Sequence, residues 1–304
     1  MTKTKKKRMT KTRIAFILFA CTIPVINWLI FYVYANLSSF TMAFTNKDGV
    51  LSFDNFVRFW GELCNQNSDI RIAIRNTFLT FFLMFVTFPL KVLVSYFLYK
   101  KIPGASVYRI LFFLPSIIFS VALNMVFAKI ISVNGPIAQM VQQAMHLEQA
   151  PELLADSRFA NTVVLLHMLW LQFPGDLIIW GGTFSRIPTE VLESGRIDGV
   201  NWWQEFTQII VPLVWPTVSL KMVLLTCGIF GASGSVFLLT GGGYGTMTIS
   251  AWMYLQLLNM SGSQYTSNAY NYMSAVGLVF TVIAVALSLV IRKWTDKAFD
   301  EVEY

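Results

Sequence analysis

The chain has 304 residues, of which 55% are hydrophobic and 13% are charged, with a mean hydropathy of +0.58 and a formal net charge of +7. This small share of charged residues is not enough to cover the surface of a water-soluble protein. The composition therefore excludes a soluble globular domain and favours a membrane protein.

Six apolar stretches are long enough to cross a bilayer core of about 30 Å, which takes roughly 20 residues in a helix. They are residues 14–34, 76–99, 107–130, 161–180, 213–239 and 273–291. Their continuous apolar character favours helices over the strands of a β-barrel, which alternate over about 10 residues. The sequence therefore predicts an all-α, polytopic integral membrane protein.

The N-terminal segment resembles a signal peptide. A basic tail, residues 1–13, precedes "IAFILFAC", which ends at Cys21 like the cleavage box of a lipoprotein. The apolar run nevertheless continues through "TIPVINWLIFYVY", and the bulky Phe19 occupies a position where cleavage sites have small residues. We expect an uncleaved first spanning helix.

The distribution of basic residues predicts the orientation. With a cytoplasmic N-terminus, the inner segments hold 15 Lys and Arg residues and the outer segments hold 5. Both termini, the segment "KKIPGASVYR" and residues 186–212 are then cytoplasmic. This asymmetry accounts for the net positive charge, so nucleic acid is not an expected partner.

Cysteines and histidines give no sign of a metal site or of catalysis. Cys21, Cys64 and Cys227 are far apart in the sequence, and neither His146 nor His167 has an acidic residue three or four positions away. Since no nucleophile and base can be paired either, we expect no enzymatic activity and no cofactor on this chain.

Residues 186–212 form a polar interval between the fourth and fifth predicted spans. Pro188 is suited to the first position of a helix, and Gly199 after Asp198 is suited to end it, because Gly accepts a positive φ. Asn201 with Gln204 three residues later matches a capping box. We expect two short helices, the second running to Pro212 and lying at the membrane interface or against protein.

The segment "LLTGGGYGT", residues 238–246, is rich in glycine. A phosphate-binding loop needs a lysine after its last glycine and a strand before it, and this segment has neither. We interpret it as the flexible outer end of the fifth span.

The polar interval resembles the EAA loop of binding-protein-dependent ABC importer permeases. The matching residues follow the order of that motif, with Ser-Gly in place of Ala-Ala and Val200 in place of Ala. They are Glu193, Ser194, Gly195, Asp198, Gly199, Phe206, Ile209 and Pro212. Similar segments of the sugar-importer branch, of the maltose and glycerol-phosphate transporter type, are "LSFDNFVRFW", "RNTF", "RILFFLP", "NGPIAQ", "RIPTE" and "LLTGGG", where the family usually has Gly-Gly-Pro.

The resemblance implies that transport and ATP hydrolysis are carried out by different subunits of a complex. Residues 14–295 would form the permease domain, between cytoplasmic tails 1–13 and 296–304, and 186–212 would be the coupling loop that contacts a separate ATPase. The implied coupling residues are Glu193, Ser194, Gly195, Asp198, Gly199 and Phe206. The implied partners are a second permease subunit, an ATPase dimer that holds ATP and Mg²⁺, an extracytoplasmic solute-binding protein and a sugar.

Aromatic and hydroxyl or amide side chains within the spans are candidates for the sugar pathway, because sugar rings stack on aromatics and sugar hydroxyls need hydrogen bonds. These candidates are Asn124, Trp170, Phe230, Ser233 and Ser235.

Alternative functions remain open from the residues alone. The permease could carry another solute, such as glycerol-phosphate, an amino acid or a polyamine. An ion-coupled secondary transporter would use ionisable residues inside the spans, for which the candidates are Lys91, His167, Asp176 and Lys221. A polytopic membrane enzyme is the third alternative, and it lacks a recognisable catalytic set.

Overall fold

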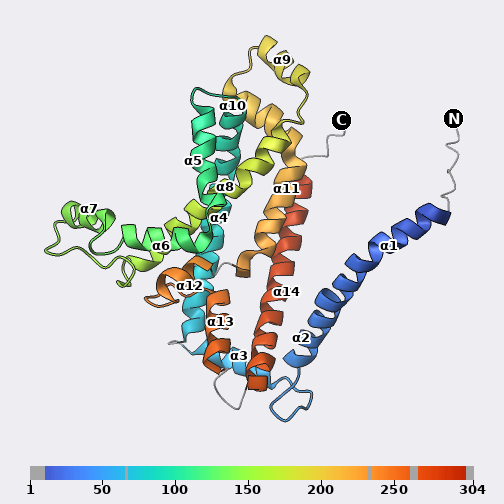
Figure 1. Cartoon of the computed structure of the whole chain (residues 1–304), viewed down its shortest axis with the longest axis vertical. Helices are drawn as coiled ribbons and strands as arrows, with labels where there is room; N and C mark the ends of the chain where they lie inside the picture. The colour runs from blue at the N-terminus through green and yellow to red at the C-terminus, as the bar shows by residue number, and fades with distance from the viewer. Residues whose placement is uncertain (1–10, 66–67, 232–233, 261–265, 299–304) are drawn as a thin grey trace. The chain divides into compact units, whose positions relative to one another are not determined.

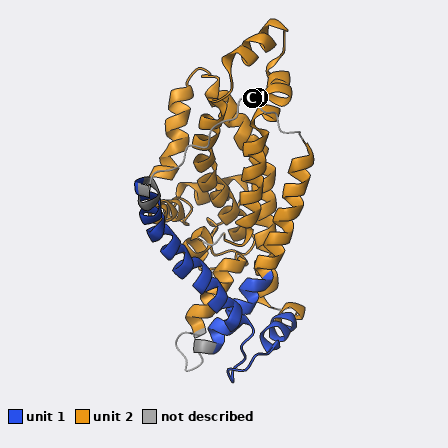
Figure 2. Ribbon diagram, turned by 90° about the vertical axis from the view of Figure 1, so that its right-hand side faces the viewer, with its two compact units in different colours: residues 1–61, 260–279 blue, residues 62–259, 280–304 orange. Residues whose placement is uncertain are grey.

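A computed structural model describes residues 11–65, 68–231, 234–260 and 266–298. Within these ranges the chain is helical apart from turns and a single β-bridge between Thr45 and Leu51, which confirms the all-α prediction. The chain divides into two compact units, drawn in two colours in Figure 2. Residues 1–61 and 260–279 form unit 1, and residues 62–259 and 280–304 form unit 2.

Unit 1 contains the first spanning helix. It runs without a break through α1 (Lys11–Trp28), a π-helical segment (Leu29–Tyr34) and α2 (Ala35–Ala43), so it is longer than the predicted 14–34. A tight turn with Gly49 at φ +75° follows, and then α3 (Asp54–Cys64) begins. The first turns of α14 (Thr266–Ala298) also belong to this unit.

Unit 2 is built around three long helices: α4 (Asp69–Tyr99), α8 (Ala160–Phe184) and α11 (Val211–Cys227). A large part of its apolar core lies between them and contains Phe88, Trp180 and Val214. The second part of α14 joins α11, because Trp215 Nε1 donates to the Thr295 carbonyl at 2.8 Å. Figure 1 shows α11 beside the second part of α14.

The predicted third span, 107–130, is not one straight helix. It consists of α5 (Ala105–Ile117) and α6 (Ser120–Ile130), which meet at an angle of 105°. Ile118 and Phe119 have ψ values of 140° and 126°, so the backbone leaves the helical conformation between them. Pro115 removes a backbone donor shortly before the break, which weakens the helix there.

The predicted fifth span, 213–239, is wrong at both ends. The helix starts earlier, with α10 (Trp202–Gln204) and a π-helical segment (Glu205–Ile210) that continue directly into α11. It stops at Cys227, and a 3₁₀ turn (Ile229–Gly231) and α12 (Gly234–Thr240) follow. The expected separate interfacial helix ending at Pro212 is therefore the first part of a spanning helix.

The described part of the chain has five helices long and apolar enough to cross a membrane, or up to six if the bent pair α5–α6 is one span. The second, fourth and sixth predicted spans correspond to the longer helices α4, α8 and α14. Three described helices are not predicted from the sequence, namely α3, α7 (Pro136–Ala144) and α13 (Ile249–Met260). The predicted first helix of the polar interval 186–212 is α9 (Thr189–Ile197).

The glycine-rich segment 238–246 consists of the end of α12 and the turns that follow it, in which Gly241, Gly242 and Gly245 have positive φ. It is attached to α4, since Asn76 Nδ2 donates to the carbonyls of Gly245 and Met247 at 2.6 and 2.9 Å. The segment is thus a set of turns, as predicted, but a buried side chain fixes it.

Candidate functional site

The helix pair in residues 186–212 forms at the end of unit 2 where α4 stops and α5 starts (Figure 1). The first helix, α9, has Pro188 as its N-cap residue and ends at Asp198, followed by Gly199 at φ +75°. The second begins with the predicted capping box. Asn201 Oδ1 accepts hydrogen bonds from the backbone N–H groups of Trp203 and Gln204, and Gln204 Oε1 accepts one from the N–H of Asn201.

The tip of this helix pair is solvent-exposed and carries both charge and an apolar side chain. Glu193, Asp198 and Gly199 are exposed, and Ile197 has 86% of its surface accessible. We call these four residues the loop face.

Two other residues of the motif are buried behind the loop face. A Cβ added to Gly195 would lie 2.8 Å from Cδ1 of Ile209, so α9 packs against the second helix with no room for a larger residue unless Ile209 moves. Phe206 is only 8% exposed, and its ring centroid lies 5.2 Å from that of Tyr96 on α4. Gly195 and Phe206 therefore position the loop, and Ser194 is exposed beside the loop face.

An ion pair anchors the second helix to α4. Lys100 Nζ, just after α4, donates to Glu205 Oε2 at 2.7 Å, and Glu205 is almost fully buried. Burial alone would lower the pKa of Lys100, but the hydrogen bond to Glu205 and the interactions with Tyr96 and the Glu205 charge outweigh it, so the pKa is raised. Sequence reasoning missed this pair, whose only signal was an acidic residue on an otherwise apolar face.

A second set of charges lies deeper in the bundle. Asp176 on α8 contacts Lys221 on α11 at 2.7 Å and Lys91 on α4 at 3.4 Å. The Lys91 side chain is 2% exposed, and those of Asp176 and Lys221 are each 20% exposed. Each lysine considered for ion coupling thus has the same acidic partner, and the three residues join three helices.

The other ionisable candidate, His167, is 1% exposed and lies in an aromatic environment. Its ring centroid is 4.1 Å from that of Phe127 and 5.8 Å from that of Trp170. Within the described residues neither ring nitrogen has a hydrogen-bond partner. His167 does not join the charged set around Asp176.

A cavity of about 300 Å³ lies where α11 ends. Thr80 and Met84 of α4, Gln172 of α8 and Leu225 of α11 line it, together with Gly228 and its neighbours at the helix break. Hydroxyl, amide and apolar groups meet here. The early end of α11, which the sequence did not predict, is what opens this space.

None of the predicted pathway residues that the structure describes lines this cavity. Asn124 is buried on α6, its Nδ2 donates to the Ser120 carbonyl, and its Oδ1 has no partner within the described residues. Trp170 lines a separate apolar cavity of about 270 Å³. Phe230 packs on Phe280, with ring centroids 4.8 Å apart. Ser235 is nearly buried on α12, and Ser233 lies outside the described residues.

Comparisons with known proteins identify relatives along most of the chain. It is 23% identical over 277 residues to the multiple sugar-binding transport system permease protein MsmF of Streptococcus mutans, covering 90% of this chain and 93% of that protein. It is 22% identical over 270 residues to the lactose transport system permease protein LacF of Rhizobium radiobacter, covering 85% and 87%. The match to the maltose/maltodextrin permease MalF of Vibrio vulnificus, at 27% identity, covers 62% of this chain and 36% of MalF.

Solved structures establish the fold. A bacterial ABC transporter involved in the import of the acidic polysaccharide alginate matches with a TM-score of 0.77 at 22% identity, over 94% of this chain and 97% of that one. The alginate transporter in complex with an alginate pentasaccharide-bound periplasmic protein also matches with a TM-score of 0.77, at 20% identity. No protein-family model matches the chain.

Proposed function

We infer that this chain is a permease subunit of a binding-protein-dependent ABC importer of the carbohydrate class, a multi-pass protein of a bacterial membrane. Its relatives over most of both chains are sugar-transport permeases, and it has the fold of an importer permease. The chain contributes part of the path that a sugar or oligosaccharide takes across the membrane.

One observation supports this function most strongly: a continuous helical segment, Trp202–Cys227, connects the loop face to the cavity. The loop face receives the ATPase, and the far end of the helix borders the space for the sugar. Because the chain has no phosphate-binding loop, ATP and Mg²⁺ bind to the ATPase dimer. Closure of that dimer shifts the permease between inward-open and outward-open populations.

The remaining partners are those that the importer class implies. A second permease subunit completes the path, and an extracytoplasmic binding protein delivers the sugar. Thr80 and Gln172 offer groups that hydrogen-bond to sugar hydroxyls, and Phe81 offers an apolar ring to a sugar face. The loop face and both termini lie in the cytoplasm, as the excess of inner basic residues predicts.

The loop face can be tested with a backbone substitution. Gly199 has φ +75° and nothing within 4 Å of an added Cβ, so Gly199→Val adds backbone strain of about 1–2 kcal/mol without a clash. We expect roughly a tenfold loss of ATPase association and of sugar uptake, with unchanged assembly with the second permease. Glu193→Lys should have the same outcome by reversing a charge on the loop face.

Gly49 provides a matched control. It has the same φ of +75° and the same free space around an added Cβ, but it lies in the turn before α3, outside residues 186–212. Gly49→Val should leave ATPase co-purification unchanged. Normal ATPase association and uptake in both Gly199→Val and Glu193→Lys would refute the coupling role.

A further inference from the structure

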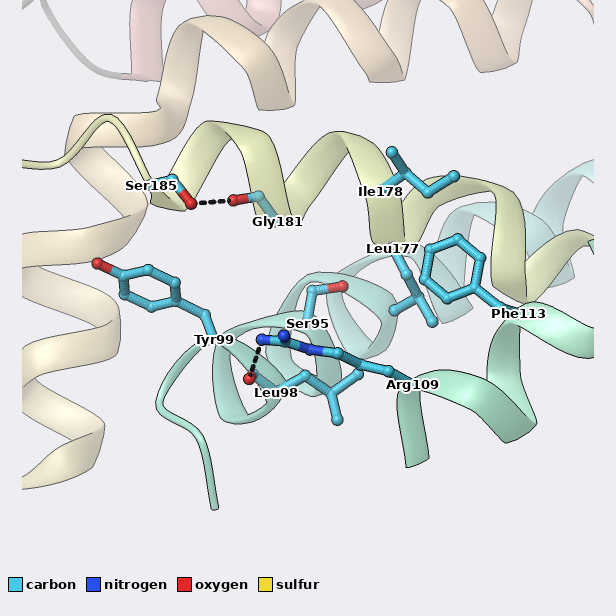
Figure 3. Close-up of a pocket in the computed structure, with 9 residues that line it drawn as sticks. All are labelled: Ser95, Leu98, Tyr99, Arg109, Phe113, Leu177, Ile178, Gly181 and Ser185. Atoms are coloured by element: carbon cyan, nitrogen blue, oxygen red, sulfur yellow. Dashed lines mark hydrogen bonds between the residues drawn. The ribbon is translucent and has the colours of Figure 1, made fainter. Parts of the chain in front are cut away.

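A groove of about 290 Å³ lies between α4, α5 and α8 (Figure 3). It is a different cavity from the one at the end of α11, since no residue lines both. Its position near the C-terminal end of α4 places it at the same end of unit 2 as the loop face. In the proposed orientation this is the cytoplasmic membrane interface.

The groove is polar at one end and apolar at the other. Tyr99 and Ser185 lie at the outer end, whereas Leu177, Ile178 and Phe113 lie deeper (Figure 3). Leu177 and Ser185 are eight positions apart, which corresponds to about 12 Å along the axis of α8. This gradient runs in the same direction as that of the surrounding lipid leaflet, from headgroups to acyl chains.

Arg109 gives the polar end a positive charge. Its Nη2 donates to the Leu98 carbonyl at 2.8 Å, which places the guanidinium over the groove and caps the end of α4. A guanidinium carries five N–H donors, so this bond leaves capacity for a phosphate, and the Tyr99 phenol adds a further donor. The hydroxyls of Ser95 and Ser185 donate to their own helices and do not contribute donors.

We propose that this groove binds an anionic phospholipid, with its phosphate at Arg109 and Tyr99 and an acyl chain along Phe113, Leu177 and Ile178. The occupant follows from charge complementarity and from the polar-to-apolar gradient. Basic pockets between spanning helices on the cytoplasmic side are suited to anionic lipid headgroups. A lipid here would hold α5 against α4 and α8, next to the Lys100–Glu205 anchor of the coupling loop.

Gly181 allows a direct test, because it lines the groove and a Cβ added to it meets nothing within 4 Å. Gly181→Leu should fill the groove without moving the backbone. Gly182 is the matched control, since it also has free space, is exposed and does not line the groove. For the charge, Arg109→Gln is compared with Arg109→Lys, and Arg186→Gln controls for charge at the same end of the molecule.

The measurement is native mass spectrometry of the assembled transporter incubated with phosphatidylglycerol, phosphatidylethanolamine or soluble glycerophosphoglycerol. We expect the wild type to retain phosphatidylglycerol preferentially, about a fivefold loss in Arg109→Gln, and a comparable loss in Gly181→Leu. Arg109→Lys should retain more lipid than Arg109→Gln, and both control variants should match the wild type.

Equal phosphatidylglycerol retention in the wild type and Gly181→Leu would overturn the proposal, as would full displacement by glycerophosphoglycerol, which would indicate a site for a soluble anion. Loss in Gly182→Leu as large as in Gly181→Leu would also overturn it. If the Arg109→Gln transporter does not assemble, lipid retention by Gly181→Leu alone decides whether the groove binds phosphatidylglycerol. Because the readout is lipid retention, the result is independent of whether the transported solute is a sugar.

Discussion

Gly195 and Gly199 lie four residues apart in the proposed coupling loop, and the structure favours glycine at each for a different reason. Gly199 has a positive φ, whereas Gly195 lies in a helix and is constrained by the distance to Ile209. We expect Gly195→Val to weaken ATPase association through overpacking of about 1–3 kcal/mol. Shortening the opposing side chain, in Gly195→Val with Ile209→Ala, should restore part of the association, whereas Ile209→Ala should not restore it in Gly199→Val.

The second prediction at this scale concerns Asp176, which pairs with two lysines inside the bundle. Asp176→Asn leaves Lys91 and Lys221 close together without a counter-charge, so it should lower the stability of the purified subunit by about 3–5 kcal/mol. Lys221→Met leaves Asp176 with Lys91 and should cost less. Thermal unfolding in detergent checks the order, and equal stability of Asp176→Asn and wild type would contradict it.

Sequence reasoning identified single residues well where the signal was local. Gly199 and the Asn201–Gln204 capping box depend on neighbours within four positions, and the structure has both features. The partners of Asp176 and Glu205 are on other helices, and pairing them requires the rotation of each helix about its axis. The periodicity of a nearly uniform apolar sequence does not specify that rotation.

At the scale of elements, the attachment of the coupling loop to α4 depends on Lys100 and Glu205. Lys100→Met leaves the buried Glu205 carboxylate unpaired, which should cost about 3 kcal/mol of local stability and release the loop. We expect faster hydrogen exchange in residues 189–210 and a loss of uptake, with the transmembrane bundle still assembled.

The pH dependence of this pair follows from the raised pKa of Lys100. A raised pKa in the folded state means that the stabilisation is complete below the ordinary value of 10.5 and is lost as the pH rises through the folded-state value. Protection of residues 189–210 should therefore not change between about pH 6 and pH 9. Loss of protection within that window in the wild type would contradict the role of Lys100.

The boundaries of the helices are the part of the secondary structure that the sequence does not predict correctly. The apolar run 107–130 looks continuous, but the backbone breaks at Ile118 and Phe119. Conversely, Pro212 and Pro216 suggest a boundary, but the helix continues through them. A π-helical segment, Glu205–Ile210, directly precedes these prolines, and such a segment changes the local hydrogen-bond pattern where a proline lacks its donor. The amino-acid composition of the segment does not predict that a π-helical segment will form before the prolines.

At the scale of the whole molecule, the orientation is open to direct measurement. Ile197→Cys places a thiol on the exposed loop face, and the native Cys64 lies in the outer loop of the predicted topology. In sealed cells, an impermeant maleimide should label Cys64 and should label Ile197→Cys only after the membrane is opened. Labelling of Ile197→Cys from outside in intact cells would reverse the proposed orientation.

The continuous helical segment Trp202–Cys227 has a mechanical consequence. Its 26 residues measure about 39 Å at 1.5 Å per residue, more than the thickness of the bilayer core. With the end at Trp202 as the pivot, a tilt of about 10° moves the other end by about 7 Å. The residues at that end, Leu224, Leu225 and Gly228, form one wall of the cavity. A small tilt of this helix, produced by a movement of the proposed coupling loop, would therefore displace the cavity wall by a distance comparable to the width of a sugar ring.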